Sequence, residues 1–161
     1  MDPPRLPKVY LETTILGYLA ARPSRDLVVA AHQELTFEWW TRRRSGFDLH
    51  CSELVIEEAS LGDGDTSRRR LALLEGVRVL RIDDRAKELA DRLLESGCLP
   101  HKARVDALHI AIAAVGSVDF LLTWNCRHIA NVQSRSSIDC LCREQGHEPP
   151  LLCTPQELMG R

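Results

Sequence analysis

Asp106-Ala-Leu-His-Ile-Ala-Ile-Ala-Ala114 is the stretch of sequence that decides the fold. An acidic residue opens a helix that is otherwise almost wholly apolar. A surface helix would carry more polar side chains, so this one is expected to be buried. The segment Asp119-Phe-Leu-Leu-Thr-Trp-Asn125 follows and is typical of a short apolar strand that ends on a polar residue. Burying the Asp106 carboxylate is costly unless an arginine, backbone N–H groups or a metal ion compensates its charge.

A second carboxylate stands at a matching place, which favours the metal ion. Lys8-Val-Tyr-Leu11 is predicted to be a strand, and Glu12 follows it directly. In open α/β sheets, ligands collect at the carboxyl ends of the strands, where Glu12 would lie. The alternative is that Glu12 is only a helix-capping carboxylate.

A third carboxylate comes from the segment after a predicted strand over 47–51. Ser52 can cap the helix that follows, and this helix carries Glu57 and Glu58. Adjacent helical residues point in different directions, so only one of the two should face a shared pocket. The sequence leaves open which one, and either could be a solvated helix charge. Three carboxylates packed together repel, which predicts a raised pKa for at least one of them.

Strands and helices alternate along the whole chain. Strands are predicted at 8–12, 47–51, 78–82, 119–123 and 151–153, and helices at 13–20, 25–44, 53–60, 66–75, 83–96, 102–115 and 134–145. This alternation is typical of a mostly parallel sheet covered on both faces by helices, a three-layer α/β/α fold. With 161 residues and no long linker, residues 1–161 are expected to form one domain.

The composition is that of an ordinary globular protein, with 44% hydrophobic and 27% charged residues. The net charge of −2 gives no global nucleic-acid signature, although local basic patches can still hold phosphates. No apolar stretch approaches the length of a membrane span, and no export signal is visible, so a cytoplasmic location is expected. The six cysteines should then be reduced, with Cys51 and Cys153 as small core residues.

Four segments in this order resemble the PIN-domain family: Val9-Tyr-Leu-Glu-Thr-Thr-Ile-Leu16, Ser52-Glu-Leu-Val-Ile-Glu-Glu58, Asp106-Ala-Leu-His-Ile-Ala111 and Leu121-Leu-Thr-Trp-Asn-Cys-Arg-His-Ile129. The resemblance extends from about Lys8 to Leu158. Members of this family are metal-dependent ribonucleases, and many are VapC-type toxins of bacterial toxin–antitoxin pairs. The resemblance therefore implies hydrolysis of single-stranded RNA with Mg²⁺ or Mn²⁺, leaving a 5′-phosphate and a 3′-hydroxyl. It also implies RNA, an antitoxin protein and a second copy of the chain as partners.

Carried over by position, the acidic site of the family falls on Glu12, Glu58, Asp106 and Asn125. The resemblance implies that Glu12 and Asp106 bind the metal directly and that Glu58 completes the shell, directly or through water. Asn125 would orient water or touch the metal. The chain departs from the family pattern at two positions, with Glu12 and Asn125 where Asp is usual. An asparagine can coordinate through its carbonyl oxygen but adds no negative charge.

Hydroxyl and basic residues near these positions are the candidates for substrate contact. The hydroxyls of Thr13 and Thr123 could position water or a phosphate, and Lys102 and Arg104 flank the start of the Asp106 helix. His109 lies one helical turn from Asp106. The family usually has an apolar residue at that position, so a packed, hydrogen-bonded histidine is favoured over a metal ligand.

Two other readings compete with a nuclease. The first is a catalytically weak PIN-like module that binds RNA or protein, in which Glu12 and Asn125 weaken catalysis. The second is a flavodoxin-like Mg²⁺-dependent phosphotransfer enzyme, which is disfavoured because the chain has no Gly-rich phosphate loop. For the adjacent Trp39 and Trp40, the sequence predicts that one is exposed, because neighbouring helical residues cannot both face one core.

Overall fold

A five-stranded, wholly parallel sheet forms the centre of the computed structural model, which describes Met1 and residues 3–160. Its strands are β1 (Lys8–Leu11), β2 (Asp48–Ser52), β3 (Arg78–Leu80), β4 (Phe120–Leu122) and β5 (Leu151–Cys153). Their order across the sheet is β3-β2-β1-β4-β5. In the register, Tyr10 lies beside His50 on one side and beside Leu121 on the other. The predicted parallel sheet is confirmed.

Helices connect the strands. They are α1 (Thr13–Ala20), α2 (Leu27–Arg42), α3 (Glu53–Ala59), α4 (Gly64–Ala72), α5 (Asp84–Glu95), α6 (Arg104–Val115) and α7 (Val132–Glu144), with short 3₁₀ turns at Arg44–Gly46 and His101–Ala103. Side-chain caps begin most of them: Asp26, for example, accepts from the N–H groups of Val28 and Val29, and Asp83 accepts from that of Ala86. No helix in the described part of the chain is long and apolar enough to cross a membrane.

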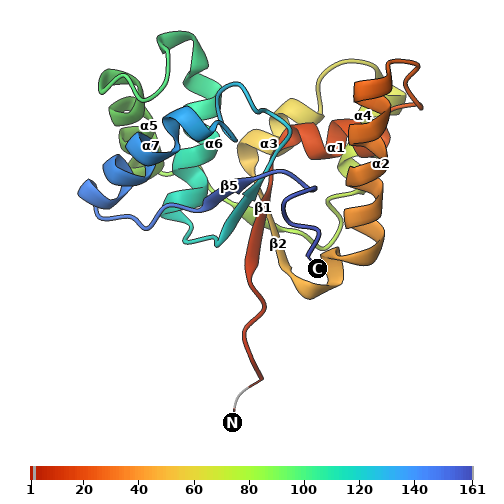
Figure 1. The fold of residues 1–161 in the computed structure, drawn as a ribbon, viewed down its shortest axis with the longest axis horizontal. Coiled ribbons are helices and arrows are strands. Elements are labelled where there is room, and N and C mark those ends of the chain that lie inside the picture. The colour runs from red at the N-terminus through yellow and green to blue at the C-terminus, as the bar shows by residue number, and fades with distance from the viewer. Residues whose placement is uncertain (2, 161) are drawn as a thin grey trace.

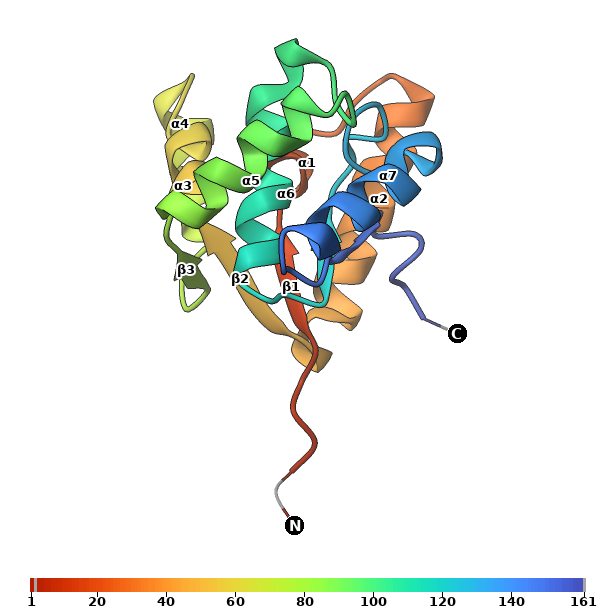
Figure 2. The same ribbon diagram turned by 90° about the vertical axis from the view of Figure 1, so that its left-hand side faces the viewer.

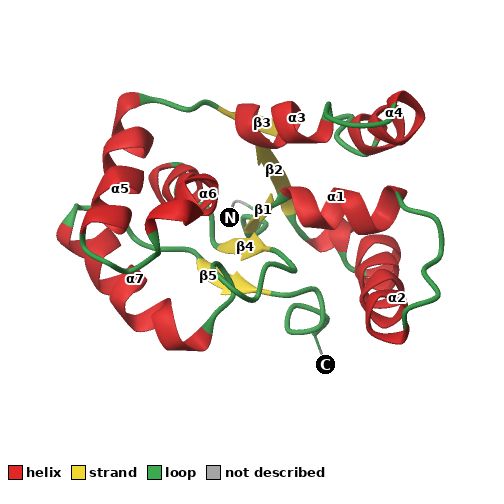
Figure 3. Ribbon diagram, turned by 90° about the horizontal axis from the view of Figure 1, so that it is seen from above, coloured by secondary structure: helices red, strands yellow, loops and turns green. Residues whose placement is uncertain are grey.

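The helices form two layers around the sheet (Figure 1). Figure 2 looks onto the layer made of α5, α6 and α7, and the view from above shows α1 and α2 on the opposite side, with α3 and α4 nearer the β3 edge (Figure 3). The predicted three-layer α/β/α architecture is therefore confirmed.

Successive side chains of β1 point alternately toward the two helix layers. Tyr10 belongs to the core between the sheet and the layer of α5, α6 and α7, whereas Val9 and Leu11 pack on the other side with Trp39. On α6, the segment 110–114 is buried throughout, so the expectation of a buried helix is confirmed. Cys51 and Cys153 are buried as the sequence indicated.

Both tryptophans of α2 are buried, so the prediction that one would be exposed is wrong. Trp39 is 0% exposed and packs against Phe47, with 5.6 Å between the ring centroids. Trp40 is 8% exposed because the guanidinium of Arg44 covers its ring at 4.5 Å. Both rings belong to the same apolar cluster beside β1, and the chain turn after α2 supplies a cover for each of them.

The topology brings the polar strand ends together. All five strands run in the same direction, so their carboxyl ends meet at one edge of the sheet. Glu12 follows β1 there, Ser52 ends β2 and begins α3, and Thr123 follows β4. These three positions are neighbours because β1 lies between β2 and β4.

Candidate metal centre

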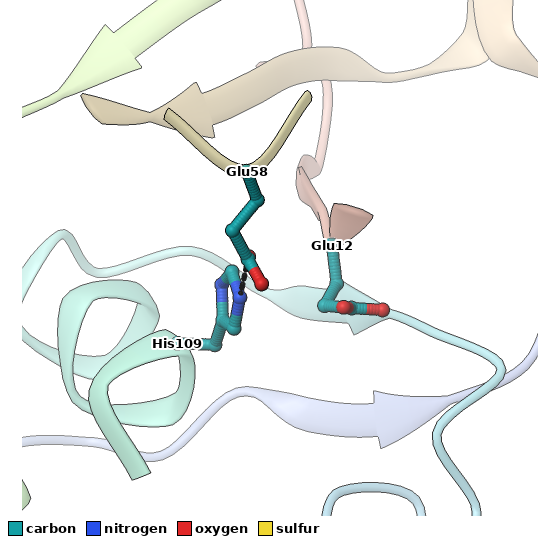
Figure 4. A group of neighbouring side chains, drawn as sticks. All are labelled: Glu12, Glu58 and His109. Carbon is teal, nitrogen blue, oxygen red and sulfur yellow. Dashed lines mark hydrogen bonds and ion pairs between the residues drawn. The ribbon is translucent and has the colours of Figure 1, made fainter. Parts of the chain in front are cut away.

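Glu12, Glu58 and His109 converge at this edge of the sheet (Figure 4). Each offers one potential ligand atom, a carboxylate oxygen or a ring nitrogen, and the three atoms lie within 4.8 Å of one another. The residues come from the end of β1, from α3 and from α6. Three elements that are distant in sequence therefore meet at one point.

Glu12 is the N-cap of α1 and one of the three converging side chains. It is 5% exposed and begins α1, and its Oε2 accepts hydrogen bonds from the N–H of Thr14 at 3.1 Å and from the Thr14 hydroxyl at 2.5 Å. The Thr123 hydroxyl donates to the same oxygen at 2.8 Å. Within the described residues, Oε1 of Glu12 accepts no hydrogen bond from the protein. The sequence left capping and site chemistry as alternatives; the structure shows the cap, and it leaves Oε1 without a donor from the described residues.

Like Glu12, Glu58 has one carboxylate oxygen that accepts hydrogen bonds and one that accepts none from the described residues. Its Oε1 accepts from the Thr13 hydroxyl at 2.7 Å and pairs with His109 Nε2 at 2.6 Å, and no described residue donates to its Oε2. The adjacent Glu57 is exposed. The structure thus answers which of the two glutamates faces the site.

The pKa of Glu58 is shifted in the direction opposite to the one that repulsion between carboxylates predicts. Partial burial raises the pKa of its carboxyl, but the hydrogen bonds from His109 and Thr13 stabilise the anion more strongly. The pKa of Glu58 therefore lies below its usual value. Glu58 is an anion at neutral pH and is available to a cation.

Asp106 lies in a neighbouring cluster with different partners. Its Oδ1 accepts from Asn125 Nδ2 at 3.0 Å and its Oδ2 pairs with His128 Nδ1 at 2.8 Å, so both oxygens are engaged. Asn125 is also fully engaged, because its Oδ1 accepts from the N–H of His128 at 3.0 Å. Asp106 is not among the three residues whose ligand atoms lie within 4.8 Å of one another.

A threonine joins the two clusters. The Thr123 hydroxyl donates to Glu12 and accepts from the N–H of Asn125 at 2.9 Å, and Asn125 in turn holds Asp106. Thr13 plays the corresponding part for Glu58. Both threonine hydroxyls expected at the site are present, and both hold carboxylates in this structure.

The two basic candidates lie at the start of α6. Lys102 is exposed in the 3₁₀ turn, and Arg104 forms an ion pair with Asp91 at 2.8 Å in which both side chains are largely exposed. An exposed ion pair is weak, so Arg104 can exchange Asp91 for another anion at little cost.

Sequence reasoning missed Tyr10 and Ser52. The Tyr10 hydroxyl lies 2.7 Å from His109 Nδ1 and 2.8 Å from Ser52 Oγ, and all three side chains are buried. Burial raises the pKa of Tyr10 well above its usual value, so it remains a phenol. One signal was available: Tyr10 and Glu12 are two residues apart at the end of a strand and so share a side of the sheet.

The donor set fits a hard divalent cation. Each of two glutamates has one oxygen held by protein donors and one oxygen with no protein donor among the described residues. Carboxylates that bind metals are commonly held in this way by hydrogen bonds to their non-ligating oxygen. Carboxylate oxygens are the ligands that Mg²⁺ and Mn²⁺ prefer.

Among solved structures, VapC proteins share this fold. A chain in the crystal structure of VapBC2 from Rickettsia felis, bound to a DNA fragment from their promoter, aligns with a TM-score of 0.58 and 14% identity, over 91% of this chain and 98% of that one. VapC20 from Mycobacterium tuberculosis, described as a toxin that cleaves the sarcin-ricin loop, aligns with a TM-score of 0.55 and 16% identity, over 70% of this chain and 86% of that one.

No protein-family model matches the sequence, and no curated protein matches it. The similarity therefore lies in the fold, which is the one that the PIN-domain resemblance implied.

Proposed function

We propose that this protein is a metal-dependent ribonuclease that hydrolyses phosphodiester bonds of single-stranded RNA. The observation that carries the proposal is the pair of half-engaged glutamates, Glu12 and Glu58, at the carboxyl edge of a sheet with the VapC fold. That VapC20 is described as a toxin that cleaves the sarcin-ricin loop supports RNA as the substrate.

In this proposal Glu12 and Glu58 hold Mg²⁺ or Mn²⁺, and Asp106 adds negative charge beside them. A divalent cation at this position supplies Lewis-acid stabilisation of the charge that develops on a phosphodiester during hydrolysis. Thr123 and Thr13 keep one oxygen of each glutamate engaged, which would leave the other oxygen for the cation. Asn125 holds Asp106 through its amide nitrogen instead of adding a fourth carboxylate. Lys102 and Arg104 contact the RNA backbone as it approaches α6.

The proposal extends to a protein partner. Leu27, Val28 and Phe37 on α2 have 86%, 65% and 57% of their surface exposed. Leu27 and Val28 lie on the first turn of α2, and Phe37, nine residues later, lines a groove with Tyr18 and Leu19 of α1. Exposed apolar side chains of this kind are available for contact with another protein. Since one of the similar structures is a VapBC complex, we assign this protein the toxin role of a type II toxin–antitoxin pair, with an antitoxin as partner.

The test is cleavage of a mixed-sequence single-stranded RNA with Mn²⁺, using chelator as the control. Glu58→Gln should reduce cleavage by about 100-fold or more, because ligand loss costs at least as much as loss of a residue that supports a ligand. Glu57→Gln is the matched control, since it makes the same change on the adjacent, exposed residue. Asp106→Asn should also abolish cleavage without unfolding the protein.

Equal cleavage by the wild type and Glu58→Gln would show that the activity arises elsewhere. A wild type that binds Mn²⁺ and RNA but cuts no RNA would support the second candidate function, a PIN-like binding module. The full engagement of Asp106 and the neutral Asn125 are the observations that favour that candidate.

A further inference from the structure

A continuous chain of hydrogen bonds ends on Glu58. The N–H of Val55 donates to Ser52 Oγ at 3.2 Å, Ser52 Oγ lies 2.8 Å from the Tyr10 hydroxyl, and that hydroxyl lies 2.7 Å from His109 Nδ1. His109 Nε2 then reaches Glu58 Oε1 at 2.6 Å. Ser52, Tyr10 and His109 are at most 1% exposed, so water does not compete for these bonds.

Counting donors and acceptors fixes the direction of this chain. If Ser52 donates to Tyr10 and Tyr10 donates to His109 Nδ1, then His109 carries its proton on Nε2 and donates it to Glu58. Every hydrogen in the chain then has an acceptor, as buried polar groups require.

The opposite direction fails at both ends. With the proton on Nδ1, the Nε2 lone pair would face a carboxylate oxygen at 2.6 Å, which sets two acceptors against each other. The Ser52 hydrogen would also have no other acceptor among the described residues. A proton on both ring nitrogens would leave one hydroxyl hydrogen of the Tyr10–Ser52 pair without an acceptor.

We propose that the Ser52–Tyr10–His109 chain locks His109 in the Nε2–H tautomer, so that His109 positions Glu58 and the cation is bound by oxygen ligands alone. The inference deepens the proposed function and rests on its metal site. A ring nitrogen of His109 lies close enough to both glutamates for the three residues to share one cation. In this tautomer, however, Nε2 carries a proton and has no lone pair with which to bind a metal. His109 would bind a metal only if the whole chain reversed, with Nδ1 donating to Tyr10 and Tyr10 donating to Ser52.

The first measurement reads the tautomer directly. Long-range ¹H–¹⁵N correlation spectra of the ¹⁵N-labelled protein distinguish protonated from unprotonated ring nitrogens, and His109→Gln assigns the His109 signals. We expect His109 to be protonated at Nε2 and unprotonated at Nδ1, both in chelator and with saturating Mg²⁺. An unprotonated Nε2 in either condition would overturn the inference.

The second measurement is Mn²⁺ affinity by titration calorimetry, with two substitutions at one position. A glutamine can place its side-chain N–H near the position of Nε2, so His109→Gln should bind Mn²⁺ within about 3-fold of the wild type. His109→Leu keeps the bulk and loses the donor, and should bind about 10–100-fold more weakly, the usual loss for a residue that supports a ligand. Equal, large losses in both variants would identify His109 as a direct ligand.

The same affinities measured with Glu58→Gln separate a positioning role from general packing. If His109 acts through Glu58, His109→Leu should cause no further loss in the Glu58→Gln protein. A further 10-fold loss there would overturn the inference. A wild type that binds neither Mn²⁺ nor Mg²⁺ would instead remove the proposed metal site, and this inference with it.

Discussion

At the scale of single residues, Glu12 and Glu58 have the same hydrogen-bonding pattern. One oxygen of each carries donors from threonines and, for Glu58, from His109, while the other oxygen is left without a protein donor in the described structure. The protein thus holds two carboxylates close together and leaves one oxygen of each without a protein donor. The lowered pKa of Glu58 is the measurable trace of this arrangement.

Glu58 should make the metal-free protein sensitive to acid. Because its pKa is lower in the folded than in the unfolded chain, it stabilises the fold at pH values above its usual pKa of 4.5. This contribution is lost as the pH falls from 4.5 through the lower folded pKa. In chelator at neutral pH, Glu58→Gln should lower the free energy of unfolding by about 1.5–3 kcal/mol, the range for hydrogen bonds to a charged group.

Thermal melts between pH 7 and pH 3 measure this difference. The gap in Tm between the wild type and Glu58→Gln should shrink as the pH falls below 4.5, whereas Glu57→Gln should follow the wild type at every pH. A gap that stays constant down to pH 3 would contradict the role given to the His109 and Thr13 hydrogen bonds.

The sequence pointed to Glu12 and to the pair Glu57 and Glu58, but it did not show which glutamate of the pair turns toward Glu12 or which residues hold these carboxylates. A carboxylate directly after a strand, as at Glu12, or on the short helix that follows one, as at Glu57 and Glu58, is visible as a local pattern. The engagement of both Asp106 oxygens by Asn125 and His128 depends on side-chain directions across a loop. The burial of Trp39 and Trp40 likewise depends on Phe47 and Arg44, which lie beyond the helix end.

At the scale of elements, α6 links the core to the site. Its first turns carry Asp106 and His109, and its later turns are buried between the sheet and α5 (Figure 2). The apolar sequence of this helix made its burial predictable, because no exposed polar face is left for water. The sequence did not predict which helix packs on α6, because the order of the strands decides which helices are neighbours.

Shortening a buried side chain of α6 should destabilise the fold far more than shortening an exposed one. Ile110 is 0% exposed, so Ile110→Ala should cost about 2–5 kcal/mol through lost burial and the cavity that remains. Val105 is on the same helix and is 47% exposed, so Val105→Ala should change stability by about 0.5 kcal/mol or less. Urea unfolding at neutral pH compares the two, and equal losses would contradict the placement of α6.

At the scale of the whole molecule, the strand order β3-β2-β1-β4-β5 is what assembles the site. It places β1 between β2 and β4, so Glu12 meets residues from α3 and from the segment after β4, although more than 100 residues of chain separate Glu12 from Thr123. Alternating strands and helices predicted a parallel sheet but not this order, because the pattern is local and the order is set by long-range packing.

A cation bound to this site should therefore stabilise the molecule as a unit, because it joins elements that separate on unfolding. If Mn²⁺ binds the folded chain alone, 100 times its Kd should add about 2.7 kcal/mol of stability. For a domain of this size, that raises Tm by about 2–4 °C for each kcal/mol. Differential scanning calorimetry should show the rise in the wild type and in Glu57→Gln, and not in Glu12→Gln. The same rise in Glu12→Gln would mean that Mn²⁺ binds elsewhere, because Glu12 is the site carboxylate that follows the central strand of the sheet.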